Sequence, residues 1–252
     1  MILLGGIFFP KSKIPDGKEV KHFTDLVRYF YCSSIQYNNG RATNHLYSAT
    51  KLYGAGVMFR NDKECGLLDI QFKKLPLLEK IPCFNISWFL TCLPCLKCFP
   101  CLECMQTLLK FPTLTVDDST EVHFRNLMAL EQCHYPSESY ICNYVVLLDC
   151  LIDTSADVEL LVKEEIIAND LGSNEEVANM VNKLCHEIVE KNSCYADLAQ
   201  DLYRHYNQGC NHHMASLRSI YFPNVWRGTT TIVGLIVFGF TFWNTIRPYA
   251  IK

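Results

Sequence analysis

Cysteine recurs at every third position in one short run of the chain, TCLPCLKCFPCLEC. Thiolates two residues apart can reach one tetrahedral zinc ion, so overlapping C-x2-C pairs are candidate zinc ligands. A zinc site usually takes its pairs from two separated knuckles, whereas these thiols form a single run that Pro94 and Pro100 stiffen. The candidate metal ligands, which we call the cysteine tract, are Cys92, Cys95, Cys98, Cys101 and Cys104.

The cysteine tract has three other interpretations, which the sequence leaves open. Thiols among apolar residues can accept palmitoyl groups, a modification that strengthens membrane attachment. Residues 81–96 carry no charge, so they also form a marginal membrane span or re-entrant segment, although a full span needs about 20 residues. In the last interpretation, the tract is an apolar insertion without chemistry.

Two further groups of potential ligands or nucleophiles lie outside the tract. Cys133 and His134 are neighbours, and neighbouring side chains on a helix point apart, so we predict a core cysteine beside a histidine near a helix end. The second group has residues that bind transition metals but no defined ligand spacing, which favours exposed or interfacial histidines. Its members are His205, Cys210, His212 and His213.

The paired carboxylates of Asp117 and Asp118 are the remaining candidates for chemistry. They precede a helical pattern, where carboxylates cap free amides and interact with the positive end of the helix dipole. The sequence contains no phosphate-binding glycine loop, nucleophile elbow or HExxH pattern. We therefore predict that the protein is not an enzyme, with no catalytic residues, no cofactor-binding residues and no cofactor.

The charge balance argues against a nucleic-acid partner. The chain has 252 residues and a formal net charge of -3, from 23 basic and 26 acidic side chains, so it lacks the basic excess that neutralises phosphates. The first residues, MILLGGIFFP, lack the basic region and cleavage pattern of a signal peptide. We therefore expect most of the 14 cysteines to be reduced and cytosolic.

Helical periodicity dominates the elements that must position these residues. Helices are expected at residues 22–32, 140–152 and 195–206, and from residues 118, 155 and 173 onwards. The helix that begins near residue 118 is predicted to turn Val122, Leu127, Leu130 and Cys133 towards the core. Residues 140–152 are apolar almost all round, which predicts the buried central helix of the domain.

Two apolar runs within residues 56–72, joined by the polar segment NDKECG, predict a β-hairpin. Residues 111–116 alternate between apolar and polar and predict a third strand. The expected fold class is therefore mainly α with a small β-hairpin or meander, an α+β arrangement.

Residues 229–246, TTTIVGLIVFGFTFWNTI, carry no charge. A helix of this length would be about 27 Å long, which nearly crosses a hydrocarbon core. Arg227 and Arg247 bound the run, and Trp226 and Trp243 match the aromatic belts of membrane interfaces. We predict one C-terminal transmembrane helix over 229–246 that contacts the lipid bilayer, with the N-terminal domain cytosolic. The sequence does not distinguish the plasma membrane from endomembranes.

Several motifs occur in an order that resembles one plant family. They are ATKLYGAGVMFR, GLLDIQF, FPTLTVDDSTEVHFRNLMALEQC, YVVLLDCLIDTSADVELLVKEEII and the C-terminal hydrophobic run. From about Val20 to Tyr249, the chain resembles the plant family called domain of unknown function 247. The resemblance implies a plant membrane-associated protein with no recognised catalytic residues. It also implies a recognition role for some relatives, in pollen self-incompatibility of grasses.

The sequence differs from the family pattern in two places. Family members usually carry a long N-terminal half before the segment that resembles residues 22–32, and a short connection where this chain has residues 73–110. We therefore divide the chain into an N-terminal helix and hairpin part (1–74), a cysteine-rich insertion (75–110), a helical part of the same domain (111–222) and the transmembrane helix (229–246).

The resulting hypothesis is a membrane-anchored, non-enzymatic recognition or signalling protein that binds an unknown protein partner. One alternative is a metal-binding or enzymatic protein that uses the cysteine tract. The other is a truncated, nonfunctional member of the family.

Overall fold

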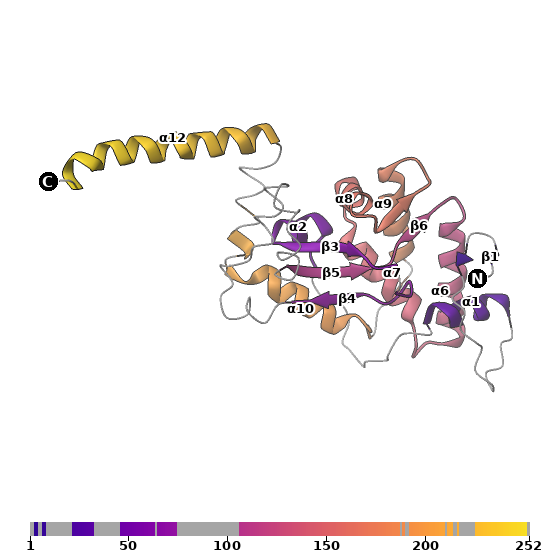
Figure 1. Ribbon diagram of the computed structural model, residues 1–252. Helices are drawn as coiled ribbons and strands as arrows, with labels where there is room; N and C mark the ends of the chain where they lie inside the picture. The colour runs from indigo at the N-terminus through magenta and orange to yellow at the C-terminus, as the bar shows by residue number, and fades with distance from the viewer. Residues whose placement is uncertain are drawn as a thin grey trace.

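The computed structural model describes residues 3–4, 7–8, 22–32, 46–63, 65–74, 106–186, 188–189, 192–209, 211–213, 216 and 225–250. At 3–4, 7–8, 225–229, 231–232 and 248–250, only the backbone is described. These residues form a mainly helical α+β fold with three small sheets (Figure 1). The structure therefore confirms one part of the predicted fold class, the mainly helical α+β arrangement.

The elements agree with most of the helical periodicity. The helices are α1 (Phe23–Cys32), α2 (Ala49–Gly54), α6 (Thr120–His134), α7 (Tyr140–Leu151), α8 (Ser155–Lys163), α9 (Asn174–Cys185), α10 (Ala196–Asn207) and α12 (Val225–Ala250). The strands are β1 (Leu3–Leu4), β2 (Ile7–Phe8), β3 (Val57–Asn61), β4 (Gln71–Lys73), β5 (Thr107–Phe111), β6 (Leu114–Val116) and β7 (Ile167–Asn169).

The largest sheet has the order β3-β5-β4. β3 runs parallel to β5, with Val57 opposite Thr107, and β4 runs antiparallel to β5, with Phe72 opposite Leu109. The predicted hairpin over residues 56–72 is therefore wrong, because β5 lies between the two strands that we expected to pair. β5 itself begins within the range 75–110 that we assigned to the insertion; the division into domains stays a prediction.

The helix α7 forms the centre of the core, as predicted. Ile141, Leu147 and Leu151 have no exposed surface, and every residue from Tyr140 to Leu148 is buried. α7 packs against α6 on one side and α9 on another. Because polar side chains are almost absent from this stretch, the helix gains its stability from burial on all sides.

The helix α6 buries a different face from the predicted one. Its buried side chains include Phe124, Leu127 and Glu131, which follow one another at helical spacing. Val122 is 60% exposed and Cys133 is also exposed, so the predicted orientation of these two residues is wrong. The reason is that the buried face of α6 includes a glutamate, Glu131, whereas we had expected only apolar side chains and a cysteine on that face.

The helix α8 begins with a capping box, in which Thr154 and the carboxylate of Asp157 satisfy backbone amides. Asp157 is buried and also accepts hydrogen bonds from the amide and the hydroxyl of Thr50, at 2.9 and 2.8 Å. Burial raises the pKa of Asp157, whereas these hydrogen bonds lower it. The net result is a pKa below the usual value of an aspartate. An ionised carboxylate therefore joins the start of α8 to α2.

The helix α12 lies apart from the other described elements (Figure 1). Its predicted role as a membrane span is wrong: no helix in the described part of the chain is both long and apolar enough to cross a bilayer. Polar side chains, Thr241, Asn244 and Thr245, interrupt its apolar sequence, and Arg247 follows them. The predictions that depend on this span, a tail anchor over 229–246 and a single-pass membrane location, are therefore also wrong.

Candidate functional site

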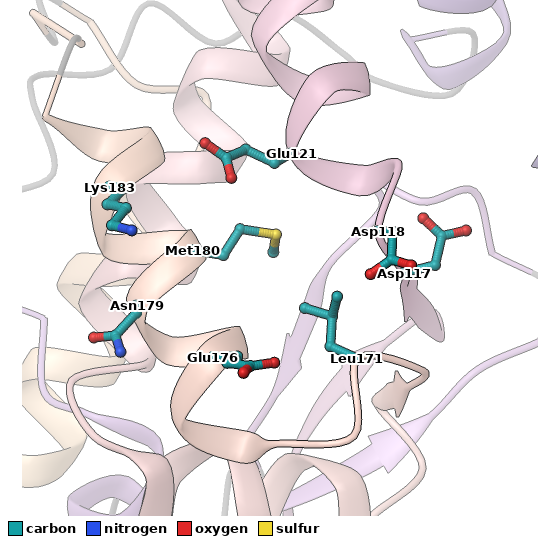
Figure 2. A pocket seen from close by; sticks show the side chains of 8 residues that line it. All are labelled: Asp117, Asp118, Glu121, Leu171, Glu176, Asn179, Met180 and Lys183. Atoms are coloured by element: carbon teal, nitrogen blue, oxygen red, sulfur yellow. The ribbon is translucent and has the colours of Figure 1, made fainter.

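An open cavity of about 330 Å³ lies between the start of α6 and one face of α9 (Figure 2). Four of its side chains are carboxylates and one is a lysine, so we call it the acidic pocket. The lining residues are Asp117, Asp118, Glu121, Leu171, Glu176, Asn179, Met180 and Lys183.

The parallel pairing of β6 and β7 determines where the acidic pocket lies. Val116 lies opposite Asn169, so both strands end at the same edge of their sheet. The residues that follow each strand, Asp117 on one side and Leu171 on the other, therefore emerge side by side. Crevices outside the carboxyl ends of parallel strands are common ligand sites in α/β proteins. The pocket occupies such a position.

The helix α9 supplies one wall of the acidic pocket. Glu176, Asn179, Met180 and Lys183 are three or four residues apart and share a face of the helix. Ser173 precedes α9, but its side chain caps no amide of that helix. The Glu176 side chain lines the pocket (Figure 2).

Asp117 is held in place by hydrogen bonds at the start of α6. Its Oδ1 atom accepts hydrogen bonds from the Ser119 amide and hydroxyl, at 2.9 and 2.8 Å, and from the Thr120 hydroxyl at 2.9 Å. The hydrogen bonds of Ser119 and then Thr120 lower the pKa of Asp117. The carboxylate is therefore ionised over a wide pH range, in agreement with the predicted capping role.

The acidic pocket combines an apolar floor with a charged rim. Met180 is buried and Leu171 half-buried, while Asp118 and Glu176 are exposed. Figure 2 shows Met180 near the middle, with the Glu121 carboxylate above it and the Glu176 carboxylate below it, on the side of Leu171. Such a lining suits a long side chain with an apolar stem and a cationic head.

A second polar cluster lies at the other end of α6. The guanidinium of Arg28 donates a hydrogen bond to Glu131 at 2.9 Å, and the two residues are 5% and 0% exposed. Arg28 also donates to the backbone oxygen of Glu138. Its guanidinium carbon lies 4.1 Å from the ring centre of Tyr135 and 5.7 Å from that of Tyr140. We call this enclosure, formed by Glu131, Tyr135, Glu138 and Tyr140, the arginine socket.

The carboxylate of Glu131 also caps α7. It accepts hydrogen bonds from the backbone amides of Ile141 at 3.1 Å and Cys142 at 3.0 Å, in the first turn of that helix. Burial raises the pKa of Glu131, and the hydrogen bonds of these amides and the Arg28 guanidinium oppose that rise. Removing the charge of either Arg28 or Glu131 would leave the other charge buried without a partner, so the socket is stable only when both side chains are present.

The thiols beside the socket are not nucleophiles. Burial raises the pKa of Cys32 and that of Cys142 to about 12, and the charge of Glu131 adds to both shifts. Only the thiolate attacks an electrophile or binds a metal strongly. Both side chains therefore act as small apolar groups near neutral pH.

The other predicted site residues that the structure describes do not assemble into a centre. The cysteine tract and Cys210 lie outside the described residues. His205 is buried, with its Nε2 atom 3.2 Å from the Ala55 oxygen, whereas His212 and His213 are exposed. Within the described ranges, no group of three or more His, Cys, Asp or Glu side chains could hold a metal ion.

Sequence reasoning missed most of the acidic pocket and the whole socket. Glu176 and Lys183 were identified only as residues of a helix, although their spacing already places them on one face. Glu131 had a detectable signal, because it occupies an apolar stripe with Phe124 and Leu127. Arg28 had none, since its partner lies 103 residues away.

Comparison with known proteins assigns the family. The model of a family described as plant protein of unknown function, DUF247, matches residues 8–240. The chain belongs to the DUF247 family. This confirms the resemblance drawn from the sequence motifs.

A curated relative of this DUF247 protein is a UPF0481 protein of Arabidopsis thaliana, 26% identical over 117 residues. The match covers 46% of the chain and only 22% of the relative's length. No solved structure matches the chain. Membership of the family therefore supplies a plant context but no activity.

Proposed function

We propose that this chain is a non-enzymatic recognition protein, and that the acidic pocket binds a lysine or arginine side chain of a partner protein. The observation that carries the proposal is the lining of the pocket. Four carboxylates, from Asp117, Asp118, Glu121 and Glu176, surround an apolar floor. Their combined field attracts a cation, and the floor accommodates its methylene stem.

The volume of the pocket supports a side chain as its ligand. About 330 Å³ is at the lower end of the range for small-molecule sites, which is enough for one long residue. The pocket is open, so the backbone of the partner would remain outside. A contact of this size contributes part of an interface, and we expect the partner to bury further surface around it.

The state of the carboxylates favours recognition over catalysis. A general acid or base works best with a pKa near the ambient pH. The pKa of Asp117 is lowered, which moves it away from that range. Glu121 forms an ion pair with Arg125 at 2.9 Å. These groups act as fixed charges in the proposed site.

Proximity labelling in plant cells tests the proposal. The experiment compares the full chain with the double variant Glu121→Gln, Glu176→Gln. We expect at least one labelled protein to be lost from the variant, because two charges have been removed at almost constant shape. The purified candidate should then bind the variant about tenfold more weakly than the original chain. Glu159→Gln, an exposed glutamate on α8 outside the pocket, is the matched control. Identical labelled sets for all three chains would exclude the pocket as a binding site.

A further inference from the structure

The two half-buried carboxylates of the acidic pocket each offer a ligand one oxygen rather than two. The three hydrogen bonds that Asp117 accepts from Ser119 and Thr120 all end on its Oδ1 atom. The contacts of Arg125 with Glu121, at 3.0 and 2.9 Å, both end on Oε1. Among the described residues, Asp117 and Glu121 therefore each keep one oxygen for a ligand.

Single oxygens suit an ammonium better than a guanidinium. A guanidinium binds a carboxylate most strongly through two parallel N–H bonds, which require both oxygens of the same group. An ammonium is a compact charge with three donors that point in different directions, and each donor needs only one oxygen. Figure 2 shows the Glu121 carboxylate above Met180 and the Glu176 carboxylate below it, so acceptors line the cavity on two sides.

The exposed carboxylates of Asp118 and Glu176 do not change this preference. Neither group is engaged by another described residue, so a guanidinium can pair with both oxygens of either one. However, an ion pair between exposed groups contributes only about 0–1 kcal/mol, because water screens the charges. These two carboxylates therefore attract either kind of cation and contribute little to the choice between them.

The arginine socket illustrates what else this protein uses to hold a guanidinium. Both oxygens of Glu131 are engaged there by backbone amides, those of Ile141 and Cys142. The socket adds the rings of Tyr135 and Tyr140 around the guanidinium. None of the eight described residues that line the acidic pocket is aromatic. The pocket therefore lacks both the ring stacking that favours arginine and the aromatic cage that binds a methylated ammonium.

We propose that the acidic pocket selects an unmodified lysine of the partner protein over arginine and over trimethyl-lysine. This inference rests on the proposed function and names the residue that the pocket recognises. Leu171 and Met180 receive the methylene stem, which these side chains share, so the choice depends on the head group. Lys183 lines the same cavity but is exposed, and it forms no ion pair with a described carboxylate. The carboxylates thus remain available to an incoming ammonium.

Methyl NMR of the full chain measures this choice at the floor of the pocket. The Met180 methyl signal is identified with Met180→Leu, a substitution that nearly conserves volume. The probes are three pentapeptides with blocked termini, Gly-Gly-X-Gly-Gly, in which X is lysine, arginine or trimethyl-lysine. We expect the lysine peptide to shift the Met180 signal with a dissociation constant at least about fivefold lower than those of the other two.

The outcomes of this titration separate the selectivity from the proposed function. Binding of the arginine or trimethyl-lysine peptide as tight as that of the lysine peptide would overturn the selectivity, and would leave cation binding by the pocket intact. A Met180 signal that none of the peptides shifts would exclude both the selectivity and the pocket as a binding site.

A ring added to the pocket tests the cause of the preference. Asn179→Tyr places an aromatic side chain at an exposed position of the α9 wall, and we expect it to raise the affinity for the arginine peptide at least about threefold relative to that for the lysine peptide. Asn126→Tyr adds the same ring at an exposed position of α6 outside the pocket, and should leave the ratio of the two affinities unchanged. The same ratio in both variants would contradict the role assigned to the missing ring.

Discussion

The carboxylate of Glu131 accepts a hydrogen bond of 3.0 Å from the backbone amide of Cys142, although the two residues belong to different helices. The same carboxylate binds Arg28 of α1, so one side chain connects α1, α6 and α7. A helix start normally depends on its own flanking residues for capping. Ser139 precedes α7 but caps no amide with its side chain, and Glu131 takes over that role.

Glu131→Ala is expected to destabilise the fold by about 3–5 kcal/mol, because it leaves the Arg28 charge buried without a partner and two amides of α7 unsatisfied. Urea unfolding followed by circular dichroism measures the change. Asp201→Ala is the matched control, since its ion pair with Arg204 is exposed and should contribute less than about 1 kcal/mol. A similar small effect for both variants would show that the Glu131 network does not support the fold.

Leu147→Asp is expected to unfold the domain or to lower its melting temperature severely. Leu147 has no exposed surface in α7, and an unpaired carboxylate at such a position costs several kcal/mol or must become protonated. Thermal unfolding by circular dichroism gives the readout. Val122→Asp places the same carboxylate on α6 at a residue that is 60% exposed, and should change the melting temperature little. Equal melting temperatures for the Leu147→Asp chain and the original one would refute the central position of α7.

His205 is expected to make stability depend on pH in mildly acidic solution. Burial lowers its pKa from 6.5 to about 4, so between these values the unfolded chain binds a proton that the folded chain excludes. This contribution to stability is complete above pH 6.5 and is lost as the pH falls through 4. The full difference is about 3 kcal/mol.

Urea unfolding at pH 7 and pH 4 measures this effect. We expect His205→Gln to be less stable at pH 7 but to lose about 3 kcal/mol less on acidification. His212→Gln removes an exposed histidine nearby and should retain the original pH dependence. The proposed role of His205 fails if all three chains respond alike to acid.

Glu165→Gly is expected to stabilise the protein by about 1 kcal/mol. Glu165 has a φ of 59°, a left-handed conformation that costs a side chain about 1–2 kcal/mol. It ends α8 in a Schellman motif, with hydrogen bonds from the Ile166 amide to Leu161 and from the Glu165 amide to Val162. Glu164→Gly, at a φ of -90°, should instead be neutral or destabilising. Chemical unfolding midpoints of the two variants compare these signs.

Local sequence signals predicted the helices because these depend mainly on neighbouring residues. The apolar run of α7 and the period of α10 both place their elements within a few residues of the observed ones. The sheet was less predictable. β5 begins at Thr107, close to the cysteine tract, and its parallel pairing with β3 joins residues about fifty positions apart. No local pattern specifies such a partner.

The candidate site was predictable only at Asp117 and Asp118, where helix-start carboxylates have a recognised role. The rest of the acidic pocket depends on the pairing of β6 with β7, and residues 167–169 carried no strand prediction. The socket depends on contact between α1 and α6. Such tertiary relationships decide which face of a helix is buried, and they explain why the orientation of α6 was wrong.

The order of strands in the largest sheet has a consequence for synthesis. β5 is the central strand, yet it leaves the ribosome after both of its neighbours, β3 and β4. At about 5–20 residues per second, several seconds pass between the release of Asn61 and that of Phe111, its partner in the register. Throughout that interval, the segments of β3 and β4 lack the strand that pairs with both of them, so the backbone hydrogen bonds of this sheet can form only after residues 107–111 have been synthesised.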